Sequence, residues 1–140
     1  MINDQQVIND LLINATTIAL VGASHKPHRD SYRVMQALQQ RGYRVVPINP
    51  SLAGQSLLGE LVYASLDDLP MPVDFVDLFV NSHAASSIVD QAIRLSLPAV
   101  WMQLGVVPVE AAERAIEAGM KVVMDRCPLI ELANQALPNR

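Results

Sequence analysis

Residues 17–34 read TIALVGASHKPHRDSYRV, and this stretch decides the fold. Its first five residues are apolar, rich in β-branched side chains and do not alternate cleanly, which is typical of a strand buried on both faces of a parallel sheet. Gly22 follows this strand and allows a tight turn. From residue 32 to residue 41 the apolar side chains recur at helical spacing. The stretch therefore predicts a strand, a glycine turn and a helix whose start is capped by Asp30 or Ser31.

The same alternation continues along the chain. One helical pattern begins at Ser82, which is expected to cap its helix, and another runs from about residue 109 to residue 118. Amphipathic helices are expected at both ends, over about residues 4–13 and 129–136. Further buried strands are expected at residues 44–48, 75–79, 99–102 and 121–124.

Strands and helices that alternate at steps of ~25 residues are typical of a doubly wound α/β fold. We expect a three-layer, Rossmann-like architecture: a five-stranded, mostly parallel sheet with helices on both faces. The irregular link is residues 49–72, where we expect a loop, an extended piece near residues 61–64 and a helical turn near residues 66–69. No linker divides the chain, so residues 1–140 are expected to form a single domain.

Composition excludes several classes of protein. With 51% hydrophobic and 17% charged residues, the chain is not of a disordered type. A formal charge of −4 argues against a nucleic-acid partner, which requires a basic surface. The single cysteine excludes an internal disulfide framework and a multi-cysteine zinc site. No apolar run reaches the ~20 residues of a membrane span, and the first residues do not resemble a signal peptide, so a cytoplasmic location is expected.

In an open parallel sheet, ligands bind outside the carboxyl ends of the strands. The loop after the first strand carries a glycine, hydroxyl groups and cations just before a helix start, a combination that suits a pyrophosphate group. The alternative is an ordinary loop with solvated cations. The side chains and backbone expected to form this cradle are Gly22, Ala23, Ser24, Lys26, Arg29 and Ser31.

The loop departs from two common nucleotide motifs. Ser24 and Pro27 occupy the later glycine positions of the dinucleotide pattern, and no Gly-Lys-Ser/Thr sequence is present. After the second strand stands Asn49, followed by Pro50, where an NAD site usually has an acid for the ribose hydroxyls. The neutral Asn49 favours a nucleotide with an additional phosphate over NAD.

The ends of the later strands supply further candidates. Asn81, Gln103, Gly105 and Arg126 are expected to line the ligand crevice. Cys127 is either a reactive thiol or a small buried apolar residue. The three histidines lack metal-ligand spacing, so we expect no metal site. The sequence has no Ser-His-Asp set in a recognisable context, no Gly-x-Ser-x-Gly and no His-Glu-x-x-His, so we expect no catalytic residue.

Together these residues resemble the small stand-alone CoA-binding proteins, which are similar to the CoA-binding domain at the start of the succinyl-CoA synthetase alpha subunit. The resemblance covers roughly residues 15–131. It rests on Val21–Ser24 with Lys26-Pro27 and Ser31-Tyr32, on Pro47-x-Asn49-Pro50, on Trp101-Met102-Gln103-Leu104-Gly105 and on Asp125-Arg126-Cys127-Pro128.

The resemblance implies that CoA lies across the carboxyl edge of the sheet, with the first loop around its phosphates and with Asn49 and Pro50 near its adenosine part. The chain departs from the family pattern at Val80, where many relatives carry arginine. Nothing in the sequence matches the ligase parts of the synthetase, so its catalytic activity is not implied.

Three functions follow as hypotheses. The leading one is non-catalytic binding of coenzyme A or an acyl-CoA, with neither the acyl group nor a protein partner specified by the sequence. The second is an NAD(P)-linked oxidoreductase, or the partner subunit of a CoA-dependent enzyme. The third is a redox or interaction module in which Cys127 lies near the thiol of the cofactor.

Overall fold

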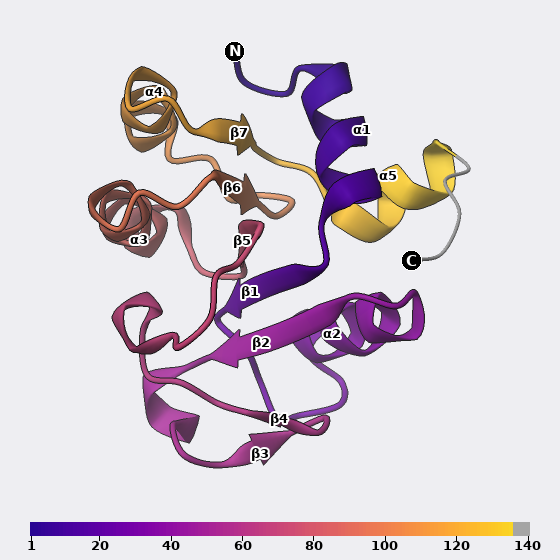
Figure 1. Ribbon diagram of the computed structural model, residues 1–140. Helices are drawn as coiled ribbons and strands as arrows, with labels where there is room; N and C mark the ends of the chain where they lie inside the picture. The colour runs from indigo at the N-terminus through magenta and orange to yellow at the C-terminus, as the bar shows by residue number, and fades with distance from the viewer. Residues whose placement is uncertain (136–140) are drawn as a thin grey trace.

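The computed structural model describes residues 1–135, and within them five parallel strands form one sheet (Figure 1). The strand order is β2-β1-β5-β6-β7, so the chain first extends the sheet to one side of β1 and then to the other. The strands are β1 (Thr17–Val21), β2 (Arg44–Ile48), β5 (Phe75–Leu78), β6 (Ala99–Met102) and β7 (Lys121–Val123).

Helices cover both faces of this sheet (Figure 1). On one face lie α1 (Gln5–Asn14), α2 (Asp30–Gln40) and α5 (Pro128–Asn134). On the other lie α3 (Ser82–Arg94) and α4 (Val109–Glu117). The expected three-layer α/β architecture is therefore confirmed.

The central strands are apolar throughout because each of their faces packs against a helical layer. In β1, Ile18 and Leu20 belong to the core beneath α1, α2 and α5, whereas Ala19 and Val21 belong to the core beneath α3 and α4. Alternate side chains of the strand therefore point into two different apolar cores, rather than one set into a core and the other into solvent. This is why the strand runs could be recognised without clean alternation.

Two expected helix caps are wrong. At the start of α2 the cap is Arg29, without a side-chain bond, and both Asp30 and Ser31 are already helical. At the start of α3, Asn81 takes the cap position and its Oδ1 accepts a hydrogen bond from the backbone N–H of Ala84 at 2.8 Å. The Ser82 hydroxyl instead accepts from the backbone N–H of Val107 at 2.9 Å and so ties the start of α3 to the loop after β6.

The link after β2 contains more regular structure than expected. A 3-10 turn covers Pro50–Leu52, and β3 (Ser56–Leu57) forms a small hairpin with β4 (Glu60–Leu61). The hairpin turn places a leucine, Leu58, at φ 48°, so it lacks the usual Asn-Gly signal that sequence analysis relies on. The helical turn expected near residues 66–69 is present as Leu66–Asp68. Residue 136, the expected end of the last helix, lies outside the described residues.

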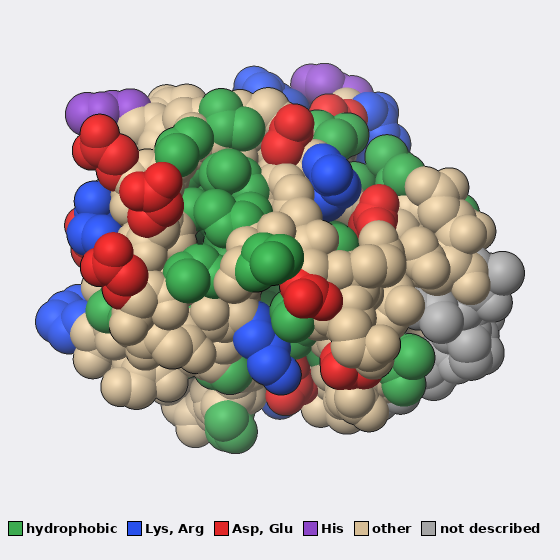
Figure 2. Space-filling view, turned by 90° about the horizontal axis from the view of Figure 1, so that it is seen from above, with side chains coloured by type: hydrophobic (Ala, Val, Ile, Leu, Met, Phe, Trp, Pro, Cys, Tyr) green, Lys and Arg blue, Asp and Glu red, His purple; other side chains and the backbone are tan. Residues whose placement is uncertain are grey.

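Figure 2 shows one face of the molecule, seen from the top of Figure 1. Hydrophobic side chains gather near its centre, and the lysine and arginine side chains are scattered among acidic ones. Among residues 1–135, no helix is both long and apolar enough to cross a membrane.

Candidate functional site

The strand order reverses between β1 and β5, and the loops that follow these two strands meet closely at Gly22. This glycine has φ 88°, and a Cβ atom added to it would lie 2.2 Å from the carbonyl oxygen of Phe79. Its backbone N–H donates to the carbonyl oxygen of Ile48 at 3.0 Å. Only glycine fits here, because both the backbone conformation and the available space exclude a side chain. Three adjoining cavities open around this point.

The first cavity, of about 470 Å³, is polar and lies between the loop after β1 and the start of α2. Lys26 and Arg29 lie exposed at this cavity, and neither is ion-paired within residues 1–135. Ser24 also lines it and accepts a hydrogen bond from the backbone N–H of Lys26 at 3.1 Å. Unpaired cations beside the amino end of an 11-residue helix form a setting that favours an anion.

Asn49 positions the loop that walls this cavity. Its Nδ2 donates to the carbonyl oxygen of Ala23 at 2.7 Å, and its Oδ1 accepts from the backbone N–H of Ser51 at 2.8 Å. Asn49 thus connects the loop after β1 to the turn after β2. An acid at this position would lack the N–H group that bonds to Ala23.

The second cavity, of about 690 Å³, lies between α2, the start of α5 and the loops after β5 and β6. It shares Asp30 and Phe79 with the first cavity, so the two adjoin. Its lining is mainly apolar, with Val34, Ala37, Val80, Leu104, Val106 and Leu129 among the contributing residues.

A buried carboxyl group lies beside this second cavity. Asp77 on β5 is fully buried, and Nε2 of Gln103 donates to both of its oxygens, at 3.0 and 3.1 Å. Burial raises the pKa of Asp77 to about 8, partly opposed by the hydrogen bond from Gln103. Burial also raises the pKa of the Cys127 thiol, so this thiol is neutral at physiological pH.

The third cavity, of about 400 Å³, is walled mostly by apolar residues and shares Gly22 and Asn49 with the first. Its apolar walls are contributed by Val21, Ile48, Pro50, Ala64, Leu66, Val80 and Ile88.

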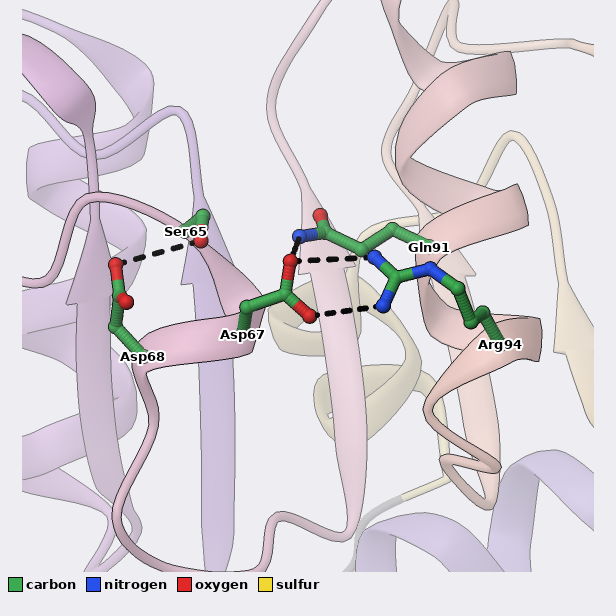
Figure 3. Close-up of polar contacts among 5 residues, drawn as sticks. All are labelled: Ser65, Asp67, Asp68, Gln91 and Arg94. Atoms are coloured by element: carbon green, nitrogen blue, oxygen red, sulfur yellow. Dashed lines mark hydrogen bonds and ion pairs between the residues drawn. The ribbon is translucent and has the colours of Figure 1, made fainter.

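An exposed ion pair fastens one wall of the third cavity to α3 (Figure 3). Nη1 and Nη2 of Arg94 donate to the Asp67 carboxylate, at 3.1 and 3.2 Å, and Nε2 of Gln91 donates to it at 2.9 Å. The hydrogen bonds from Arg94 and Gln91 lower the pKa of Asp67. Nearby, the Ser65 hydroxyl donates to Asp68 at 3.4 Å. These contacts hold the turn that carries Leu66 against the cavity.

The cavities bring together ten of the twelve residues expected to bind the ligand. Gly105 and Arg126 line none of the three; they lie exposed beside them, where the backbone N–H of Gly105 bonds to the Asp125 carboxylate at 2.7 Å. The first cavity is lined by Gly22, Ala23, Ser24, Lys26, Arg29, Ser31 and Asn49, the second by Asn81 and Gln103, and the third by Gly22, Asn49 and Pro50.

Sequence reasoning missed most of the apolar lining. Phe79 touches both the first and second cavities, and Val80 both the second and third. Phe79 is the last residue of the strand expected at 75–79 and Val80 follows it directly, so their position at a strand end was the available signal. Trp101 is fully buried, and its Nε1 donates to the carbonyl oxygen of Arg126 at 3.0 Å, so it supports this edge from within the core. Within the described part of the chain, no three potential metal ligands gather.

Comparison with known proteins now decides the family. The family model described as a CoA binding domain matches residues 16–133. The chain belongs to the CoA binding domain family. The match covers all five strands of the sheet and every residue that lines the three cavities.

Similar proteins occur both as short chains and within longer ones. YneT of Bacillus subtilis is 33% identical over 120 residues, which are 86% of this chain and 87% of YneT. A solved structure from Pyrococcus horikoshii is 37% identical, with a TM-score of 0.89 over 96% of this chain and 93% of its own. The dinucleotide-forming acetyl-coenzyme A synthetase 1 of Ca. Korarchaeum cryptofilum is 26% identical, with a TM-score of 0.67 over 81% of this chain but 26% of its own.

Proposed function

We propose that this protein binds coenzyme A or an acyl-CoA across the carboxyl edge of its sheet and catalyses no reaction by itself. One observation carries the proposal: a polar cavity with two cations, Lys26 and Arg29, neither ion-paired within residues 1–135, adjoins two cavities with mainly apolar walls. CoA has matching parts, since its charged phosphates are joined to an adenine ring on one side and to a pantetheine chain on the other. Membership of the CoA binding domain family supports this assignment.

Each cavity suits one part of the ligand. The first, with Lys26, Arg29 and the start of α2, suits the pyrophosphate and the ribose phosphate, because cations and free helical N–H groups stabilise phosphate oxygens. The third, with Ile48 and Pro50 in its walls, suits the flat adenine ring. The second suits the pantetheine chain and its thiol end, near Gln103.

The proposal excludes catalysis because the cavities offer no evident nucleophile and base. The Cys127 thiol has a raised pKa and lies beside a carboxyl group that is itself held neutral near pH 7. We place the binding role in the cytoplasm, where a lone reduced cysteine is expected.

A second candidate is a partner subunit of a CoA-dependent enzyme. The observation that favours it is the similarity to 26% of the acetyl-coenzyme A synthetase chain, in which a domain of this kind is joined to others. Under this alternative, the same three cavities hold CoA and another chain provides the reacting groups. Purification followed by intact mass analysis separates the two candidates: an associated second chain favours the partner subunit, and its absence favours the protein that binds CoA alone.

The cradle is tested by Lys26→Ala and Arg29→Ala, with CoA binding measured by isothermal titration calorimetry. A charge-assisted contact contributes about 1.5–3 kcal/mol, so each variant is expected to weaken CoA binding roughly tenfold or more. A smaller loss with dephospho-CoA identifies the cation that contacts the ribose phosphate.

Lys121→Ala is the matched control, since Lys121 is an exposed lysine at the amino end of β7, the opposite edge of the sheet. It is expected to leave CoA affinity unchanged. Unchanged affinity in both Lys26→Ala and Arg29→Ala would remove the loop from the site, and no binding of any CoA species to the parent protein would refute the proposal.

A further inference from the structure

We propose, resting on the proposed function, that the second cavity holds the acyl group of an acyl-CoA beside the thiol end of the pantetheine chain and selects uncharged, apolar acyl groups. The cavity is the largest of the three at about 690 Å³ and adjoins the phosphate cavity through Asp30 and Phe79. A ligand whose phosphates occupy the first cavity therefore reaches the second directly. The selectivity follows from the walls, the charges and the polar groups of this cavity.

The walls are apolar and come from separate parts of the chain. Helix α2 contributes Val34 and Ala37, the loop after β6 contributes Leu104 and Val106, and α5 contributes Leu129. Val34 and Val106 are only 8% and 6% exposed, so their side chains are part of the packed core and form a fixed wall of the cavity. Apolar walls of this kind gain free energy when they exclude water from an alkyl chain.

The charged groups at this cavity disfavour an acidic acyl group. Asp30 and Arg33 line it, and they form an ion pair with each other. Nη1 of Arg33 also donates to the carbonyl oxygen of His28 at 2.9 Å, and Nη2 donates to Asp30, so both terminal nitrogens of Arg33 are already hydrogen-bonded. Beside the cavity lies the buried Asp77, held by Gln103. A carboxylate on the acyl chain would meet one lining cation, Arg33, which already pairs with Asp30, and would lose water beside the buried, neutral carboxyl group of Asp77.

The polar groups that remain suit the thioester. Gln103 is 6% exposed, and its amide is fixed through Nε2 by Asp77. Asn81 uses its Oδ1 to accept from Ala84 at the start of α3, which leaves its Nδ2 as a donor. Asn81 Nδ2 therefore provides a hydrogen bond for one carbonyl group, and neither amide adds a charge that would bind an acidic acyl group.

The test compares CoA, hexanoyl-CoA and succinyl-CoA by isothermal titration calorimetry. Each methylene buried contributes about a fourfold gain in affinity when fully removed from water. Hexanoyl-CoA is therefore expected to bind at least about tenfold tighter than CoA, whereas succinyl-CoA is expected to bind no tighter than CoA. Equal affinity for CoA and hexanoyl-CoA, or tighter binding of succinyl-CoA, would overturn the inference.

Ala37→Phe fills the cavity from α2, and the ratio of hexanoyl-CoA to CoA affinity is the readout. This ratio is expected to fall to within about threefold of unity. Ala133→Phe is the matched control, because Ala133 is exposed on α5 and lines none of the three cavities, so it is expected to keep the parent ratio. A ratio that survives in Ala37→Phe contradicts the acyl assignment. If the parent protein binds no CoA species, the proposed function is overturned as well. If it binds CoA but binds hexanoyl-CoA no more tightly, only this inference is overturned.

Discussion

Replacing Asp77 with asparagine tests how the polar floor of the second cavity is built. Asp77 is fully buried, and its contact in the core is the amide of Gln103 rather than a cation. Asparagine has nearly the same shape and cannot ionise, so the variant keeps the packing and removes the ionisable carboxyl group at this position. We expect Asp77→Asn to fold and to become more stable than the parent protein as pH rises.

The magnitude follows from the pKa of Asp77, which burial raises from 3.8 to about 8. Between about pH 4 and pH 8, the folded protein keeps a proton on Asp77 that the unfolded chain has released. The free energy of unfolding of the parent therefore falls as pH rises, by up to about 1.4 kcal/mol per pH unit. From pH 5 to pH 7 the difference between variant and parent is expected to grow by up to about 2.7 kcal/mol and to level off above about pH 8.

Urea denaturation at pH 5, 6, 7 and 8 measures this difference directly. Groups shared by the two proteins cancel in the subtraction, and the raised pKa of Cys127 keeps its titration above this range. Two parallel stability curves would refute the reasoning, because they would mean that Asp77 has the same protonation in the folded and unfolded states throughout. A difference that shrinks as pH rises would show that the folded state favours the ionised carboxylate.

Three further predictions concern single residues around the site. Gly22→Ala is expected to cost roughly 2 kcal/mol or more in urea denaturation, because it combines backbone strain with a clash at Phe79; Gly119→Ala, with a similar φ of 87° but no neighbour within 4 Å, should show only the smaller strain cost. The Cys127 thiol is expected to react with iodoacetamide more slowly than a free thiol at pH 7 and to accelerate only above the usual cysteine pKa, and fast reaction at pH 7 would contradict its burial. In the parent, the Asp67 carboxylate stabilises the fold above the usual carboxyl pKa, and this contribution is lost as pH falls below that pKa, so Asp67→Asn is expected to remove it. Thermal melts in which the difference between variant and parent does not depend on pH would contradict this prediction.

The sheet could be predicted closely from the sequence. The bounds of β1, β2 and β6 match the expected runs because each is a short apolar segment that ends where a glycine or polar residue begins. The hairpin of β3 and β4 could not be predicted, because its turn uses Leu58 at positive φ, and long-range contacts with β2 hold it in place. The expected caps differ from the observed ones by one or two residues, since adjacent polar side chains such as Asn81 and Ser82 are equivalent in local pattern.

The candidate site was predictable where it depends on one loop and not where it depends on strand order. Gly22, Lys26 and Arg29 follow one another closely in the chain, so their joint position at a helix start could be inferred. The second cavity instead combines α2, the ends of β5 and β6, and the start of α5. The role of Asp77, a carboxyl side chain within an apolar run, does not follow from the sequence either, because its pairing with Gln103 requires β5 and β6 to be neighbours.

The measurement that tests the central claim most directly is the shift in melting temperature with CoA and with NAD at equal concentration. A ligand that binds only the folded state stabilises it by ~2.7 kcal/mol at 100 times its Kd, which for a domain of this size is a rise of several degrees. We predict such a rise with CoA or a short acyl-CoA, and a smaller one in high salt because exposed phosphate contacts are screened. NAD is expected to give little or no shift. A clear shift with NAD and none with any CoA species would contradict the account and favour an NAD(P)-linked oxidoreductase.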